Sequence, residues 1–477
     1  MTKPIHTRVP WFALLLAAGF AVTVAAQAPR QPDWTTLEAE ILQHYQALLR
    51  LDTSDPPGRE QPVADYVKAV FDKEGIAAQL YSLEPGRPNV IARLKGNGRK
   101  KPVLIIGHSD VVNVDPKKWT FPPFSATRDG GYVYGRGTVD DKDNLTATMM
   151  VMLELKRLNV PLDRDVIFLS EAGEEGTARV GMQFVANQHY PEIDAEYCFA
   201  EGGGVTRING QVKYAQVQTL EKIPYAIELT ATGVSGHASV PLVTNAVVHL
   251  SNAVAAVAAW KPDIRLNETT GTYFRRLAGI SAPEDAQRYR DAIAPGTKAQ
   301  AAADDFFLHN EPRHSSMLRT SISPTMITAG YRLNVIPSEA RATLDVRMLP
   351  DEDPAKFLEQ VKRVVNDPTV DAHFTARDVR PGQPGAKLDS EAFKAVEAAV
   401  TKHYNTVTLP TMSTGATDMA YLRVKGQQCF GLGPATDIED GPKGFGSHSD
   451  QERLLESELY RFVRFHWDIV FDLAHAR

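Results

Sequence analysis

Cysteine, surplus positive charge and long apolar runs are all scarce in this chain of 477 residues. Its two cysteines, Cys198 and Cys429, are too few for a disulfide scaffold or a thiolate metal cluster, so nitrogen and oxygen must hold any bound metal. Each lies in an apolar, strand-like run. Although export would permit a disulfide, we interpret both as buried free thiols.

Basic residues do not outnumber acidic ones. The chain has 52 lysines and arginines against 58 aspartates and glutamates, and a formal net charge of -6. No cationic surplus is therefore present to neutralise a phosphate backbone. We expect no nucleic acid partner.

One apolar run of some length lies near the N-terminus, at residues 11–26. Lys3 and Arg8 precede it, and Ala26 and Ala28 offer small residues for cleavage, which is typical of a secretory signal peptide. A membrane anchor is the alternative, but the run is shorter than the ~20 residues that a spanning helix needs. We expect a secreted or periplasmic protein with no stable membrane anchor after cleavage.

Apolar periodicity predicts two kinds of domain. Strand-like runs at 103–106 and 166–169 flank a helical stretch at 145–158, which Asp143 or Asn144 could cap. Such alternation is typical of a parallel sheet covered by helices. After about residue 221 the order becomes β-α-β-β-α-β, which predicts a small antiparallel sheet with two helices on one face.

The predicted fold class is therefore α/β with an inserted α+β domain. Its predicted parts are a signal peptide at 1–28, a first domain at 29–221 and 383–477, and an inserted domain at 222–382. The predicted elements of the inserted domain are strands at 224–232, 326–333, 340–349 and 373–377 and helices at 245–260 and 354–365. The stretch 262–325 is interpreted as an insertion in this small domain.

Polar residues follow several of the predicted strands. Because parallel strands present ligands beyond their carboxyl ends, we expect these residues to converge on one cleft. The segments concerned are 107–110, 171–176, 201–204 and 446–450, with 135–142 leading into the predicted helix.

Two histidines and several carboxylates in one cleft suit a divalent metal. Zinc fits best, cobalt or manganese nearly as well, and carboxylates can bridge two ions. Asp110 lies two residues beyond His108, where it can hold the second imidazole nitrogen. Glu174 and Glu175 point apart, so one can bind metal while the other takes a proton from water. Each residue alone has a structural explanation, and only the combination favours a metal hydrolase.

Six motifs together resemble the M20 family of metallopeptidases, and most of all its secreted glutamate carboxypeptidases. They are GHSDVV at 107–112, GRGTVDDK at 135–142, EEG at 174–176, GVSGHA at 233–238, NVIP at 334–337 and GSHSD at 446–450. The resemblance covers nearly the whole chain beyond residue 28, with the motifs in the family's order.

This resemblance implies a zinc-exopeptidase-type mixed sheet with helices on both faces and two divalent metal ions. Asp140 matches the bridging carboxylate, which in such enzymes precedes a cis peptide bond. The implied ligands are His108, Asp140 and Glu201 for one metal and Asp140, Glu175 and His448 for the other. Glu174 matches the general base.

The resemblance also implies that the inserted domain is a lid that forms a homodimer. His237 matches a residue that reaches the active site of the partner subunit, and Asn334 and Arg347 match substrate contacts. Arg347 would hold a carboxylate bidentately. An ion pair with a nearby aspartate is the alternative for Arg347, and Arg380 is another candidate for the carboxylate.

The sequence departs from the family pattern at two positions near the site. Asp143 stands where the family usually has glycine, and Gly173 stands where an acidic residue is common. Neither matches a ligand, so we expect activity to be retained. The stretch 262–325 is longer than in compact members of the family, and it is the feature that bears on substrate preference.

The expected function is that of a dinuclear, metal-dependent exopeptidase, a carboxypeptidase or dipeptidase, that hydrolyses an amide bond next to a free carboxylate. An N-acyl amino acid deacylase needs the same residues and is the alternative. An inactive binding protein on this fold would have lost a metal ligand or Glu174, and none is missing.

Overall fold

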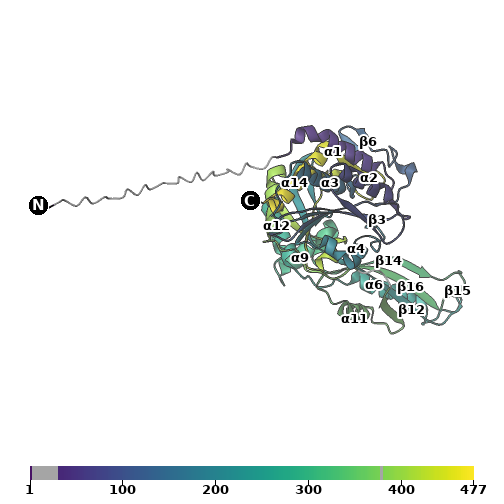
Figure 1. Cartoon of the computed structure of the whole chain (residues 1–477). Coiled ribbons are helices and arrows are strands. Elements are labelled where there is room, and N and C mark those ends of the chain that lie inside the picture. The colour runs from purple at the N-terminus through teal and green to yellow at the C-terminus, as the bar shows by residue number, and fades with distance from the viewer. Residues whose placement is uncertain (3–30, 376–379, 477) are drawn as a thin grey trace. The chain divides into compact units, whose positions relative to one another are not determined.

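The computed structural model describes residues 1–2, 31–375 and 380–476, and from Pro32 onward the chain forms one compact unit (Figure 1). The predicted signal peptide falls almost entirely on residues 3–30, outside the described residues. Among the helices that the structure describes, none is long and apolar enough to cross a membrane.

A ten-stranded sheet forms the centre of the described part of this unit. Its spatial order is β2 (Ala78–Ser82), β3 (Pro88–Leu94), β8 (Val166–Glu171), β4 (Val103–His108), β9 (Tyr197–Ala200), β19 (Gln428–Gly431), β11 (Gln211–Glu221), β10 (Gly204–Ile208) and β20 (Ala435–Asp437), with β18 (Thr408–Ser413) beside β11. The neighbours β8, β4, β9 and β19 run parallel, as predicted. Antiparallel pairs flank them, so the sheet is mixed, as the family resemblance implied.

Helices cover both faces of the large sheet because successive apolar side chains of its central strands point to opposite faces and are buried on both. Along β4, Val103 and Ile105 pack into one apolar cluster, and Leu104 and Ile106 pack into another. The first cluster includes residues of α1 (Trp34–Leu49), α2 (Gln61–Lys73), α3 (Lys142–Arg157), α12 (Glu391–Tyr404) and α14 (Glu456–Ala474). The second includes α4 (Met182–Gln188), α5 (Tyr190–Ile193) and α13 (Met419–Arg423). Figure 1 shows α1 to α3 above the sheet and α4 below it.

Helix ends follow the chemistry of their flanking residues. Ser390 accepts a hydrogen bond from the Phe393 amide and caps α12, which ends at Asn405 in the left-handed region, at φ 47°. Helix α3 begins at Lys142, so Asp143 and Asn144 lie in its first turn, and the prediction that one of them caps it is wrong.

The smaller sheet has four antiparallel strands, in the order β14 (Ser321–Ala329), β16 (Glu339–Met348), β12 (Ile223–Thr232) and β17 (Val370–Phe374). Helices α6 (Ala246–Ala259) and α11 (Pro354–Val365) pack on it and on each other. The predicted element order is confirmed, but β17 begins three residues before the predicted start and ends at Phe374. The domain boundaries at 222 and 382 stay predictions.

The helices of the stretch 262–325 do not pack on the small sheet, contrary to our prediction, and only residues 321–325 join it, as the start of β14. These helices are α7 (Glu268–Ile280), α8 (Pro283–Ala292), α9 (Lys298–Asn310) and α10 (Pro312–Met317). They share an apolar cluster with Leu409 of β18, and Arg276 donates to Glu397 of α12 and to the carbonyl of Thr408. The helices therefore cover an edge of the large sheet, because that is where their apolar faces find a partner.

The two cysteines are paired, so our interpretation as free thiols is wrong. Cys198 on β9 and Cys429 on β19 form a disulfide with a Cα–Cα distance of 4.5 Å. The two strands are parallel neighbours, and their register sets these residues directly opposite each other. A separation of 231 residues concealed that proximity in the sequence.

Short elements complete the described fold. The paired strands are β1 (Ser54–Asp55) with β5 (Val111–Val112), β13 (Gly236–His237) with β15 (Val335–Ile336), and β7 (Tyr132–Tyr134) with both β6 (Thr127–Asp129) and β21 (Arg453–Leu455). Single 3₁₀ turns span Pro116–Lys118 and Ile438–Asp440.

A buried lysine lies where the chain passes from the large sheet to the small one. Lys222 donates to the hydroxyls of Ser316 and Ser321, at 3.0 and 3.1 Å. Burial and, to a smaller extent, the guanidinium groups of Arg319 and Arg347 together lower the pKa of Lys222 to about 7. The junction therefore holds a lysine whose protonated form destabilises the folded state.

This lysine makes the free energy of unfolding depend on pH. Above about pH 7 the folded state binds fewer protons at Lys222 than the unfolded state, whose lysine titrates near 10.5. Stability should therefore rise toward pH 10, by up to ~1.4 kcal/mol per pH unit. Urea unfolding at several pH values should show this rise in wild type and in a Lys213→Met control, and a flatter profile in Lys222→Met. Parallel profiles for wild type and Lys222→Met would contradict the assignment.

Candidate active site

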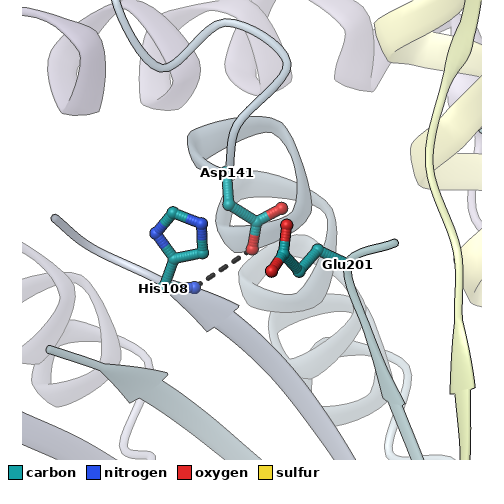
Figure 2. A group of neighbouring side chains, drawn as sticks. All are labelled: His108, Asp141 and Glu201. Atoms are coloured by element: carbon teal, nitrogen blue, oxygen red, sulfur yellow. Dashed lines mark hydrogen bonds between the residues drawn. The ribbon is translucent and has the colours of Figure 1, made fainter. Parts of the chain in front are cut away.

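Strand ends bring the predicted ligands together. His108 ends β4, Glu201 follows β9, and Asp140 and Asp141 precede α3. Figure 2 shows His108, Asp141 and Glu201 converging from these elements. Because β4, β8 and β9 are parallel, their carboxyl ends meet at one edge of the sheet, which is where the sequence predicted a cleft.

Asp140 lies between two imidazoles. Its Oδ1 is 3.0 Å from Nε2 of His108, and its Oδ2 is 3.0 Å from Nε2 of His448. The same His448 nitrogen is 3.1 Å from Oε1 of Glu175. Burial alone would raise the pKa of Asp140, but the two histidines outweigh it and lower the pKa. The peptide bond from Asp140 to Asp141 is cis, as the resemblance implied.

The surroundings of His108 fit a cation. Its Nδ1 is 3.0 Å from the carbonyl oxygen of Asp110, which can only accept, so Nδ1 carries a proton. Its Nε2 faces the carboxylate of Asp140, and two acceptors cannot face each other without a proton or a metal ion between them. Burial lowers the pKa of His108, yet the carboxylates of Asp110 and Asp140 raise it well above its usual value. Nitrogen and oxygen atoms so arranged are the donors that zinc binds.

The neighbouring Asp141 already has protein donors on both oxygens. The backbone amide of His108 donates to Oδ2 at 3.1 Å (Figure 2). Asn144 donates to Oδ1 at 2.5 Å. Ligand atoms of His108, Asp141 and Glu201 lie within 4.8 Å of one another, as do those of His108, Asp140 and Glu175. Since the oxygens of Asp140 face the two imidazoles, Asp140 fits the bridging position better than Asp141.

Carboxylates crowd around this point. Burial, Glu174 and Asp140 raise the pKa of Glu201 well above its usual value. Burial likewise raises the pKa of Asp141 to about 7, with Asp140 adding to the effect. Such repulsion is relieved when divalent cations bind between the carboxylates.

Asp110 positions the glutamate pair. Its Oδ1 accepts from the backbone amide of Glu174 at 3.1 Å, and its Oδ2 accepts from that of Glu175 at 3.0 Å. We predicted that this carboxylate holds the imidazole of His108. The Asp110 carbonyl makes that hydrogen bond, and Oδ1 lies 3.6 Å from Nδ1.

The preceding Gly173 has a conformational reason for its identity. Its φ is 71°, and a Cβ there would lie 2.7 Å from the carbonyl oxygen of Thr177. The turn before the glutamate pair therefore excludes the acidic residue that is common in the family. The other departure, Asp143, is fully buried, and neither of its oxygens has a hydrogen-bond partner among the described residues.

Glu174 has a cationic partner that the sequence did not assign to it. Nη2 of Arg380 lies 3.0 Å from Oε1 of Glu174 and 2.9 Å from Oδ1 of Asp418. Burial raises the pKa of Glu174 to about 8, although Arg380 opposes that rise. A carboxyl group with a raised pKa, next to the predicted ligands, suits a group that accepts and returns a proton.

Asp418 and Glu452 are the residues at this site that sequence reasoning missed. Asp418 follows β18, whose sequence TLPTMS is buried but not apolar, so no apolar run pointed to it. Glu452 is fully buried and accepts from Arg136 at 2.7 Å and from the amide of Val139 at 2.8 Å. It holds the loop that ends at Asp140, and no local pattern signals that role.

His448 is held on an exposed loop. Its side chain is 53% exposed, and its φ is 61°, which is uncommon for a residue other than glycine. Hydrogen bonds to Asp140 and Glu175 raise the pKa of His448 to about 10. A strained backbone that aims a side chain at a carboxylate cluster is typical of a functional position.

Two cavities adjoin the carboxylates and share no lining residue. One, here called the arginine cavity, has a volume of about 400 Å³, and its lining includes Glu174, Glu175, Arg347 and Arg380. The other, here called the glycine cavity, has a volume of about 510 Å³, and its lining includes Asp140, Glu201, Gly202, Gly203, Gly433 and Arg313.

Arg347 forms the alternative ion pair, and its substrate contact stays a prediction. Its Nε donates to Oδ1 of Asp345 at 2.7 Å, which is the alternative ion pair. It also lines the arginine cavity with the glutamate pair, as a substrate contact would. The ion pair orients the guanidinium at the cavity wall.

His237 and Asn334 are not brought to the carboxylates by contacts within this chain. Both are exposed at the far end of the small sheet, where His237 pairs with Val335. Nδ1 of His237 is 2.7 Å from the hydroxyl of Ser239, and Asn334 accepts from the amide of Ala238 at 3.0 Å. Within the described residues, the hydrogen bonds of His237 and Asn334 stay within this end of the small sheet.

Known proteins resemble this chain over most of its length. “Probable carboxypeptidase S-like 2” of Dictyostelium discoideum is 27% identical over 381 residues, which cover 78% of this chain and 71% of that protein. “Probable succinyl-diaminopimelate desuccinylase” of Staphylococcus aureus (strain MSSA476) is 28% identical over 348 residues, which cover 72% of this chain and 76% of that protein. The M20 family metallo-carboxypeptidase Sso-CP2 of Sulfolobus solfataricus superposes with a TM-score of 0.67 at 21% identity, covering 90% of this chain and 98% of that one. That structural likeness shows the fold.

The family model described as “Peptidase family M20/M25/M40” matches residues 104–472. The match begins in β4 and ends in α14, so it includes the large sheet except β2 and β3, the small sheet and all five predicted metal ligands. The chain therefore belongs to peptidase family M20/M25/M40 and is a hydrolase of amide bonds.

Proposed function

We propose that this protein is a dinuclear metal-dependent exopeptidase that hydrolyses an amide bond next to a free carboxylate. The position of Asp140 carries the proposal, because its two oxygens face the Nε2 atoms of two different histidines. His108, Asp140 and Glu201 would hold one divalent cation, and Asp140, Glu175 and His448 the other. Zinc is the metal that these donors favour, with cobalt or manganese as substitutes.

Two cations held there would supply Lewis-acid chemistry, which polarises the scissile carbonyl and acidifies water. Glu174 takes a proton from the attacking water at its carboxylate and delivers it to the leaving amine nitrogen. Arg380 orients that carboxylate through its 3.0 Å contact with Oε1. Arg347, at the wall of the arginine cavity, binds the free carboxylate of the substrate.

Deacylation of N-acyl amino acids is the second candidate function. The same residues would cleave an N-acyl amide bond, and the desuccinylase relative favours this alternative. The two functions differ in what lies on the acyl side of the bond, so a substrate panel separates them.

We further propose that the protein is secreted or periplasmic and acts as a homodimer. The N-terminal segment with its apolar run supports export. For the dimer, the support is β14, an edge strand of the small sheet on which Met326 and Ile327 are 62% and 61% exposed. An exposed apolar edge strand is a natural surface for a second copy.

Replacing the general base tests the proposed function directly. Glu174→Gln keeps the shape of the side chain and removes the base, so turnover should fall by roughly 10²- to 10⁴-fold while metal content stays unchanged. The assay is a panel of dipeptides and N-acyl amino acids, with and without chelator. The exposed Glu192→Gln is the control, and Glu174→Gln with wild-type turnover would refute the proposal.

Removal of a histidine ligand should reduce metal content as well as rate. His108→Ala and His448→Ala each take away a ligand of one ion, so elemental analysis should find about one metal per chain instead of two. His373→Ala, an exposed histidine paired with Asp371, should keep both. Two metals per chain in both ligand variants would show that these histidines do not bind metal.

Arg347→Lys should distinguish a carboxylate contact from a surface ion pair. Lysine cannot form the two parallel hydrogen bonds of a guanidinium, so kcat/KM should fall roughly tenfold for substrates with a free C-terminal carboxylate. The same substrates amidated at that end should lose little. Arg341→Lys, on the same strand and paired with Glu228, is the matched control. Equal losses on both substrate forms would exclude the carboxylate contact.

Mixing inactive variants should test the proposed role of His237 across a dimer. Glu174→Gln and His237→Ala are each expected to be inactive alone. In a mixed dimer, one site combines an intact Glu174 with an intact His237 of the other chain, so activity should partly return. If subunit exchange is demonstrated by mass and activity stays absent, His237 does not act on the partner.

A further inference from the structure

The glycine cavity opens beside the predicted metal ligands. Asp140 and Glu201 line its inner end, and glycines line much of its wall. Gly203 has no room for a side chain, since a Cβ there would lie 2.2 Å from the carbonyl oxygen of Gly431. With a volume of about 510 Å³, the cavity can hold a substrate group of several carbon atoms.

Most charged groups of this cavity already have partners. Asp437 lies 3.4 Å from Nε of Arg207 and accepts from the hydroxyl of Tyr132 at 3.1 Å. Asp440 is paired with Arg453, whose Nε is 3.1 Å from Oδ2. Asp140 and Glu201 face the predicted metal ions.

Arg313 is the exception. It is exposed on α10 and lines the cavity mouth, and among the described residues no carboxylate lies within ion-pair distance of its guanidinium. Among the charged groups at the mouth of the glycine cavity, the guanidinium of Arg313 is therefore a positive charge without an ion-pair partner in the described part of the chain. A guanidinium in that state favours an anion, and it matches a carboxylate bidentately.

The same arginine links the glycine cavity to a third cavity of about 420 Å³. Arg313, Thr436 and Ile438 line both, so the two cavities adjoin along this wall. Tyr214 and Tyr273 line the third cavity. Arg313 therefore lies where the two cavities adjoin.

We infer that the glycine cavity takes the acyl side of the substrate and that Arg313 selects an acyl group with its own carboxylate. This inference rests on the proposed function, which assigns the C-terminal carboxylate to the arginine cavity. Because the two cavities share no lining residue and meet at the carboxylates, the acyl part must occupy the other one. The substrate class is then an amide with a negative charge on each side of the scissile bond, such as an N-dicarboxyl-acyl amino acid or a dipeptide with an N-terminal acidic residue.

Matched substrate pairs test this selectivity on the metal-loaded enzyme. N-succinyl-leucine and N-succinamoyl-leucine differ only in the charge of the acyl end, as do N-acetyl-Glu-Leu and N-acetyl-Gln-Leu in their side chain. Wild type should prefer the charged member of each pair about fivefold in kcat/KM, the upper range for an exposed charge pair. Arg313→Gln should reduce the preference to about one by slowing the charged substrates alone, and Arg313→Lys should retain part of it.

Arg275→Gln is the matched control, since Arg275 is an exposed arginine of the same helical stretch and lines none of these cavities. It should leave the preference unchanged. An Arg313→Gln variant that keeps the preference would overturn the inference. Equal slowing of both members of each pair would also overturn it, because that result indicates a structural role.

A binding measurement separates failure of the inference from failure of the proposed function. If wild type hydrolyses no member of any pair, the proposed function fails on these substrates. Calorimetric titration with succinate and with its monoamide then decides the inference alone. Tighter binding of succinate by wild type, lost in Arg313→Gln and kept in Arg275→Gln, supports the anion site, and equal effects on both ligands refute it.

Discussion

Repulsion among buried carboxylates is the constraint on which the site depends. Asp140 and Asp141 precede α3, Glu174 follows β8 and Glu201 follows β9, and all four converge at one edge of the large sheet, where burial and mutual repulsion raise the pKa of most of them. Such a cluster persists only where other groups compensate it. Backbone amides at Asp110, two imidazoles at Asp140 and Arg380 at Glu174 provide part of that compensation. Bound divalent cations would neutralise the negative charge that these groups leave uncompensated.

The parallel centre of the sheet explains why so much of the site could be predicted from sequence. His108 and Glu201 directly follow short apolar runs, and strands of that kind end at a common edge. Hydrophobic periodicity therefore predicts that both residues lie at that edge. The family motifs indicate which of these residues bind metal and which acts as the base. The geometry of Asp140 agrees with the bridging position that the motifs imply.

Other features could not be predicted because they depend on which strands become neighbours. The disulfide joins residues that are far apart in the sequence and adjacent only through the pairing of β9 with β19. Asp418 follows a strand that is buried without being apolar, so its environment, not its sequence, marks it. For α7 to α10, amphipathic patterns predict helices but do not specify which sheet they cover.

The attachment of α7 to α10 has a mechanical consequence. These helices are joined to the large sheet through Arg276 and the cluster with Leu409, so the wall that bears Arg313 is attached to the sheet that carries the carboxylates. The arginine cavity, by contrast, includes Pro224 and Arg347 from the small sheet. A rotation of the small sheet about Lys222 would therefore move Pro224 and Arg347 in the arginine cavity, whereas the glycine cavity has no lining residue from the small sheet.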